Sequence, residues 1–160
     1  MKNIKLEINY ELRQMDELSE EDAALMRKAM DATDHSYAIY SHFQVGAAIR
    51  LKDGRVIIGA NQENASFPLG TCAERSAIFA AQAQYPDQPI VAIAIAAKNL
   101  HGFVKTPVTP CGACRQVMLE IEQRYHQPMR IMLFGTDGII CVNGGIRDLL
   151  PLSFIDENMH

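Results

Sequence analysis

A run of eight consecutive apolar residues at 90–97 constrains the fold more than any other feature of this sequence. A strand with one face in water alternates apolar and polar residues, whereas an uninterrupted apolar run is typical of a strand that is covered on both faces. The run therefore predicts a central strand between two other layers. Helices on both sides of a sheet supply such layers in α/β proteins.

Other segments of the chain provide the remaining elements. Three segments show helical periodicity or are rich in helix formers: residues 19–34, 72–84 and 111–125. Four further segments are rich in strand formers: residues 44–51, 55–60, 129–134 and 139–142. Asp53-Gly54 favours a hairpin turn between the first two strands, so the sheet contains antiparallel as well as parallel neighbours. We expect a three-layer α/β/α fold with a mixed five-stranded sheet.

The N-terminal residues carry a different pattern. Apolar side chains alternate with polar ones at Ile4, Leu6, Ile8, Tyr10 and Leu12. This period of two predicts an extra strand with one buried face. With 160 residues the chain fits one domain. We therefore expect an N-terminal extension over 1–18 and a single domain over 19–160.

Charge and hydropathy exclude several classes of partner. The formal net charge of −4 argues against a protein that follows a polynucleotide backbone, which needs a basic surface. No apolar run approaches the roughly 20 residues of a membrane span, and the first residues do not resemble a signal peptide. We expect a cytoplasmic protein with reduced thiols that binds neither nucleic acid nor membrane and acts on a small neutral molecule.

Three of the four cysteines lie at the starts of predicted helices. Cys72 begins one helix, and Cys111 and Cys114 begin another in a Cys-x-x-Cys pattern. Helix N-termini favour the thiolate form that a metal needs, and three thiolates leave a fourth zinc position for water. We expect one Zn²⁺ per subunit at these residues. Cys141 lies inside an apolar strand, where a small buried residue is the better interpretation.

A lone Cys-x-x-Cys is also compatible with a redox pair or with two small buried residues. The Cys-x-Glu-Arg segment at 72–75 changes this balance, because together with Pro-Cys-x-x-Cys-Arg at 110–115 it matches the signature of zinc deaminases in a three-cysteine form. Glu74 would then move protons between water, a ring nitrogen and a departing amine. The alternative is a solvated Glu in a first helical turn.

These motifs resemble those of the homotetrameric cytidine deaminases. The resemblance extends to segments 40–48, 61–64 and 149–154, and it covers residues from about 20 to 154. It implies hydrolytic deamination of free cytidine and deoxycytidine to uridine and deoxyuridine, with release of ammonia, in pyrimidine salvage. It also implies a homotetramer whose active sites are shared between subunits.

The resemblance assigns roles to further residues. It implies that Phe43 stacks on the pyrimidine, that Asn61 and Glu63 bind ribose hydroxyls, and that the Ala73 N–H and the Thr109 carbonyl bind the base carbonyl and the leaving amine. It implies that Phe154 stacks on the base in a neighbouring subunit. Arg75 and Arg115 would compensate the charge of three thiolates, Arg75 by hydrogen bonds to them. The plainer alternatives are a core Phe43, a turn at Asn61, surface ion pairs for the two arginines, and a Phe154 that packs on its own subunit.

The sequence departs from the family at Ile39, at Phe67 and in its first 18 residues, and none of its five histidines is expected to bind metal. Two other functions stay open. A related small-molecule deaminase, such as a blasticidin S deaminase, shares the zinc and proton-shuttle motifs, although Phe154 favours a cytidine enzyme. A noncatalytic zinc or redox module is the second.

Overall fold

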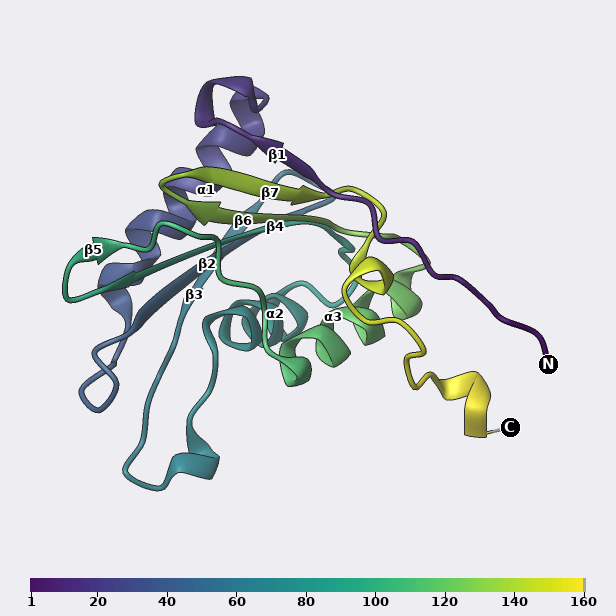
Figure 1. Ribbon diagram of the computed structural model, residues 1–160. Helices are drawn as coiled ribbons and strands as arrows, with labels where there is room; N and C mark the ends of the chain where they lie inside the picture. Colours follow the sequence, from purple (N-terminus) through teal and green to yellow (C-terminus); the bar gives the residue numbers. More distant parts are fainter. Residues whose placement is uncertain (160) are drawn as a thin grey trace.

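The computed structural model describes residues 1–159 and contains one mixed sheet with three long helices (Figure 1). The strands are β1 (Glu11–Arg13), β2 (Gln44–Leu51), β3 (Val56–Ala60), β4 (Ile90–Asn99), β5 (Gly102–Phe103), β6 (Arg130–Gly135) and β7 (Gly138–Val142). The helices are α1 (Glu20–Ala32), α2 (Ala73–Gln84) and α3 (Gly112–Tyr125). Short 3-10 turns occur at Met15–Glu17, Thr33–His35, Phe67–Leu69, Ile146–Asp148 and Asp156–Met159.

The sheet has the strand order β1-β7-β6-β4-β2-β3, and the short β5 pairs with β4. Strands β4 and β6 are parallel because α3 connects them, and the other neighbours are antiparallel. The apolar run at 90–97 forms most of β4, which lies between β2 and β6, so the predicted central strand is confirmed.

Side chains on the two faces of the sheet belong to different core clusters. Ile93 and Ile95 of β4 join the cluster that contains α2 and α3 residues, whereas Ala92 and Ala94 join the cluster that contains α1 residues. Figure 1 shows α1 on one face and α2 and α3 on the other. The predicted three-layer α/β fold is confirmed, and its five strands are joined in the sheet by β1 and β5. In the part of the chain that the structure describes, no helix has the length and hydropathy to cross a membrane.

The N-terminal strand is much shorter than the alternating pattern predicts. Only Glu11–Arg13 pairs with a neighbour, β7, and residues 1–10 adopt no regular structure. Ile4, Leu6, Ile8 and Tyr10 are exposed. The predicted extra strand is therefore present as β1 but is shorter than expected, because β7 ends at Val142, opposite position 10 in this register, and residues 4–9 extend beyond it. The division of the chain at residues 18 and 19 stays a prediction.

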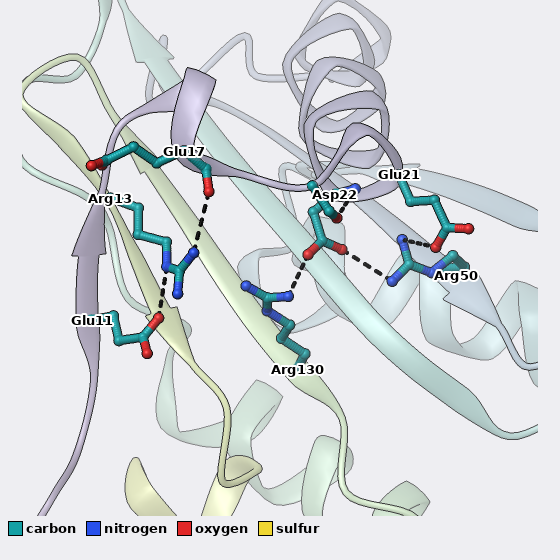
Figure 2. A network of polar contacts seen from close by, with 8 residues as sticks. Glu11, Arg13, Glu17, Glu21, Asp22, Arg50 and Arg130 are labelled. Carbon is teal, nitrogen blue, oxygen red and sulfur yellow. Dashed lines mark hydrogen bonds and ion pairs between the residues drawn. The ribbon is translucent and has the colours of Figure 1, made fainter.

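A buried carboxylate attaches α1 to the sheet (Figure 2). Ser19 caps α1 by accepting a hydrogen bond from the Asp22 N–H, as its sequence position predicts. The Asp22 side chain is buried and accepts hydrogen bonds from Arg50 Nη2 of β2 at 3.0 Å and from Arg130 Nη1 of β6 at 2.5 Å. Two arginines, from the strands on either side of β4, therefore hold the first turn of α1 in place.

Helix α2 lies so close to β3 that only glycine fits at position 59. A Cβ atom built there would lie 2.5 Å from the Ala73 carbonyl oxygen, which is closer than non-bonded atoms approach. Ala73 is the first residue of α2, so this contact sets the position of the helix start. The start of α2 is where Cys72 and Glu74 lie.

Candidate functional site

The N-termini of α2 and α3 bring three cysteines together. Cys72 is the N-cap of α2, Cys111 is the N-cap of α3, and Cys114 lies in the first turn of α3. Their Sγ atoms all lie within 4.8 Å of one another. The Cys72 and Cys111 Sγ atoms are 3.8 Å apart, and those of Cys111 and Cys114 are 3.5 Å apart. The structure thus brings together the three cysteines that sequence spacing alone selected.

This sulfur cluster fits a zinc ion. Zn–S bonds of about 2.3 Å in tetrahedral geometry place two sulfur atoms about 3.8 Å apart, and the observed separations of 3.8 and 3.5 Å approach that value. No histidine or carboxylate joins the cluster among residues 1–159, so a fourth position is left for water. Cys141 is buried on the α1 side of the sheet, away from the cluster, in agreement with its interpretation as a small core residue.

The Arg75 guanidinium lies beside the thiols. The Arg75 Nη2 atom lies 3.6 Å from the Cys72 Sγ atom, where it donates a hydrogen bond. Hydrogen bonds from Cys114 and then from Arg75 and Cys111 lower the pKa of the Cys72 thiol to about 5, although partial burial acts in the opposite direction. The hydrogen bond to Cys72 and burial raise the pKa of Cys114. These neighbours thus favour the thiolate form of Cys72, which is the form that a metal binds.

Glu74 lies in the first turn of α2, two residues after Cys72. The side chain is buried, with 5% of the residue exposed, and it lines the same cavity as Cys72 and Cys111. Burial is the main reason why the pKa of its carboxyl group is raised. A carboxyl group with a raised pKa is suited both to accept and to return a proton.

The cavity in front of the cysteines has a volume of about 640 Å³, within the usual range for small-molecule sites. Five residues that were expected from the sequence to contact the substrate line this cavity: Phe43, Asn61, Glu63, Ala73 and Thr109. Among the described residues, its lining contains two carboxylates and no lysine or arginine. Such a cavity suits a neutral or cationic ligand better than an anion.

Asn61 and Glu63 also hold the backbone in the wall of this cavity by hydrogen bonds. The sequence did not indicate this structural role. Asn61 Oδ1 accepts from the Val45 N–H at 2.8 Å, and its Nδ2 donates to the Phe43 carbonyl at 2.9 Å. Glu63 Oε2 accepts from the N–H groups of Tyr40 and Ser41, and Oε1 accepts from the Ser41 hydroxyl. Each side chain keeps unused hydrogen-bonding capacity that can face a ligand.

Apolar residues complete the wall. Ile95 of β4 and Val108 both line the cavity, although no sequence motif pointed to them. Val108 directly precedes Thr109, so its position beside the site was accessible from the sequence. Ile95 reads in the sequence as an ordinary core residue of β4, and only the fold shows that it also faces the cavity.

Arg115 and Phe154 lie outside the cavity lining. The Arg115 guanidinium contacts no thiolate and instead donates to the carbonyls of Pro110 and Leu149 and to the Thr109 hydroxyl. The Phe154 residue is 59% exposed, and its carbonyl accepts a hydrogen bond from Gln116 Nε2 at 3.0 Å. Within one subunit, therefore, Phe154 does not reach the cavity of its own chain.

Comparisons with known proteins agree with this geometry. Residues 19–126 match the family described as the cytidine and deoxycytidylate deaminase zinc-binding region. A protein named cytidine deaminase from Halalkalibacterium halodurans is 43% identical over 136 residues, which are 85% of this chain and 96% of that protein.

Two crystal structures of cytidine deaminases have a similar fold. The structure from Burkholderia pseudomallei superposes with a TM-score of 0.70 at 40% identity and covers 82% of this chain and 97% of its own. That from Mycobacterium tuberculosis gives a TM-score of 0.64 at 32% identity and covers 82% of this chain and 95% of its own. The family match at residues 19–126 extends over the cysteine cluster and the cavity lining.

Proposed function

The chain belongs to the cytidine and deoxycytidylate deaminase family, and we propose that it hydrolyses cytidine and deoxycytidine to uridine and deoxyuridine with release of ammonia. The observation that carries this proposal is the buried Glu74 carboxyl group beside the three-cysteine cluster, in a cavity of nucleoside size. Cys72, Cys111 and Cys114 would hold one zinc ion. As a Lewis acid, the bound ion would lower the pKa of a water molecule and make it nucleophilic at neutral pH.

Glu74 moves the protons of the reaction. Its carboxylate accepts a proton from the attacking water and delivers it to N3 of the cytosine ring while the oxygen adds to C4. Glu74 then takes the proton of the new C4 hydroxyl group and delivers it to the amino group. The C4–N4 bond breaks, which releases ammonia and leaves the uracil carbonyl at C4. Cytidine and one water molecule thus become uridine and ammonia. Arg75 offsets the negative charge of the thiolates through its hydrogen bond to Cys72.

The cavity walls orient the nucleoside. The Phe43 ring stacks on the pyrimidine, and Asn61 supports that stacking because it holds the backbone that directly follows Phe43, through the Phe43 carbonyl and the Val45 N–H. Asn61 and Glu63 direct their unused donor and acceptor sites to ribose hydroxyls. The Ala73 N–H at the start of α2 donates to the base carbonyl, and the Thr109 carbonyl accepts from the departing amine.

Phe154 supports a shared active site. Because its ring is exposed and lies outside the cavity of its own chain, it is free to stack on a base that is bound in a neighbouring subunit. We therefore propose a homotetramer in which each cavity is completed by the tail of another copy. Reduced thiols at the metal site fit action in the cytoplasm, where the reaction would return free pyrimidine nucleosides to salvage.

One assay tests the proposed function. The zinc-loaded protein is incubated with cytidine, deoxycytidine, cytidine monophosphate, adenosine and blasticidin S, and the loss of substrate absorbance is followed together with ammonia release. We expect turnover of the two cytosine nucleosides. Turnover of blasticidin S alone would identify a different small-molecule deaminase, and stoichiometric zinc without any turnover would indicate a noncatalytic module.

A further inference from the structure

The N-terminal arm, defined here as residues 4–10, has the sequence pattern of a half-buried strand but buries neither face in one subunit. Its apolar side chains are Ile4, Leu6, Ile8 and Tyr10, and between 51% and 77% of each residue is exposed. Leu12 in β1 continues the same alternation and is also exposed. Large apolar groups at such regular spacing are costly to leave in water, so the pattern points to a surface that covers them.

The arm continues an open edge of the sheet. Strand β1 is the last strand on its side, and within residues 1–159 it pairs only with β7. Its other edge presents unpaired N–H and C=O groups, which are a template for another strand. Figure 1 shows the arm running on from β1 past the segment that follows β7, toward the N-terminus. A strand of suitable length can therefore add along β1 and the arm together.

We propose that this strand is the same arm of a second copy, paired antiparallel across a twofold axis at Ile8. Only the register centred on Ile8 places every apolar residue of the set 4, 6, 8, 10 and 12 opposite another member of that set. Such pairs share one face and contact one another directly. The apolar pairs are Ile4 with Leu12, Leu6 with Tyr10, and Ile8 with its own copy.

Charge complementarity selects the same register. With Ile8 at the centre, Lys5 lies opposite Glu11, and Glu7 lies opposite the neutral Asn9. A shift of two residues in one direction places Glu7 opposite its own copy, and a shift in the other direction places Glu7 opposite Glu11 and Lys5 opposite Arg13. A shift of one residue turns the apolar side chains of one arm to the polar face. Both kinds of shift are therefore disfavoured.

The paired arms also find apolar surface to cover. Leu12 pairs with Ile140, whose side chain packs against the core cluster on the α2 and α3 side of the sheet. Farther along the arm, Leu6 and Ile8 share a groove of about 400 Å³ with the 147–153 segment. Its apolar lining there consists of Leu150, Pro151 and Leu152. In the proposed register, Tyr10 of the partner subunit lies beside Leu6 and covers this groove.

This dimer contact goes beyond the proposed function and does not depend on it. No arm residue lines the cavity in front of the cysteines, and none belongs to the cysteine cluster. Substitutions in the arm should therefore leave zinc content unchanged. The contact is isologous, because each copy gives and receives the same segment, so it joins two copies and no more.

Disulfide formation tests the register. In zinc-loaded Ile8→Cys protein the two new thiols face each other, at a separation that a disulfide can span. We expect cross-linked dimers under mild oxidation. The matched control is Leu6→Cys, whose thiol faces Tyr10 of the partner subunit and should cross-link only when it is mixed with Tyr10→Cys protein. The unsubstituted protein reports any background from the native cysteines.

A charge exchange tests the partner. Both charge variants also carry Ile8→Cys. In a homodimer of the Lys5→Glu variant, two acidic residues face each other at each of the two 5–11 pairs, and in a homodimer of the Glu11→Lys variant two basic residues do so. A heterodimer of the two variants has opposite charges at both pairs. We expect cross-linked heterodimers above the share that random mixing gives, and fewer homodimers than in the parent. Equal cross-linking yields in all charge combinations would overturn the proposal. So would cross-linking of Leu6→Cys protein without Tyr10→Cys protein, or a lack of cross-linking of Ile8→Cys protein.

Discussion

The Arg115 Nη1 atom donates to the Leu149 carbonyl oxygen at 2.6 Å, across 34 positions of sequence. The same guanidinium donates through Nε to the Pro110 carbonyl at 2.7 Å. Pro110 directly precedes Cys111, and Leu149 precedes the tail that carries Phe154. One arginine therefore connects the loop that positions a metal ligand with the segment that positions an exposed aromatic ring.

We expect Arg115→Lys to loosen this connection without releasing zinc. A lysine keeps the charge but cannot reach two carbonyls and a hydroxyl at once, and a hydrogen bond from a charged group contributes about 1.5–3 kcal/mol. The Tm should fall by roughly 3–12 °C, while zinc content stays stoichiometric. Arg124→Lys is the control, because Arg124 donates one surface hydrogen bond to Gln82. Equal Tm values for the two variants would contradict the connecting role.

Glu74→Gln should reduce kcat by roughly 10² to 10⁴, the usual contribution of a general acid and base, and should leave zinc in place. The amide has the shape of the carboxyl group but cannot carry the proton. Glu20→Gln is a matched control, since Glu20 also lies in the first turn of a helix but is exposed. Near-normal turnover of Glu74→Gln would show that Glu74 is only a helix-start residue.

Cys72 in the cluster and Cys141 in the core allow a direct comparison of two cysteine environments. Cys72→Ala leaves two thiolates in the cluster, so the protein should lose zinc together with much of its thermal stability. Cys141→Ala removes a thiol that packs in the core on the other side of the sheet, so it should lower the Tm only modestly and keep zinc. Metal analysis and thermal unfolding measure both. Stoichiometric zinc in Cys72→Ala would mean that the ligand set is wrong.

Much of the site was predictable because it follows local rules. Cys72 and Cys111 were expected at helix starts, and both are N-caps in the structure. The apolar run at 90–97 was expected between two layers, and β4 lies there. In these cases a short segment contains the physical cause, either the unpaired N–H groups of a first turn or an uninterrupted apolar stretch.

Contacts between distant segments were not predictable. Asp22 lies in the first turn of α1, and the fold buries it between Arg50 and Arg130, which are 28 and 108 positions away. Likewise, the alternation at 4–12 indicates a strand, but it does not say which surface receives the apolar face. Periodicity reports the shape of a segment, while its partner depends on the topology of the sheet.

The cavity should discriminate against nucleotides. Glu63 and Glu74 are its charged lining residues, and a sugar phosphate would bring further negative charge toward Glu63. We expect kcat/KM for cytidine to exceed that for cytidine monophosphate by at least about tenfold, which corresponds to about 1.4 kcal/mol. Glu63→Gln removes the repulsion and should narrow this ratio. Comparable values for both substrates in the unsubstituted protein would contradict the electrostatic argument.

Phe154 should act on a base that is bound in a neighbouring subunit. Phe154→Ala should raise KM, because stacking of an aromatic ring on a base contributes roughly 1–3 kcal/mol. The ring is exposed and lies outside the cavity of its own chain. Mixing Phe154→Ala subunits with inactive Glu74→Gln subunits after dissociation should therefore create some sites that combine an intact Glu74 from one chain with an intact Phe154 from another.

Activity of the reassembled mixture should exceed the combined activity of the two parents at substrate concentrations below the KM of Phe154→Ala. The comparison is informative because each parent lacks one component at every site, whereas a mixed assembly regains both at some sites. Each parent alone, taken through the same dissociation and reassembly, controls for changes in the fraction of folded protein. If Phe154→Ala weakens substrate binding and the mixture shows no gain, the ring completes the cavity of its own chain and the shared site is wrong for this protein.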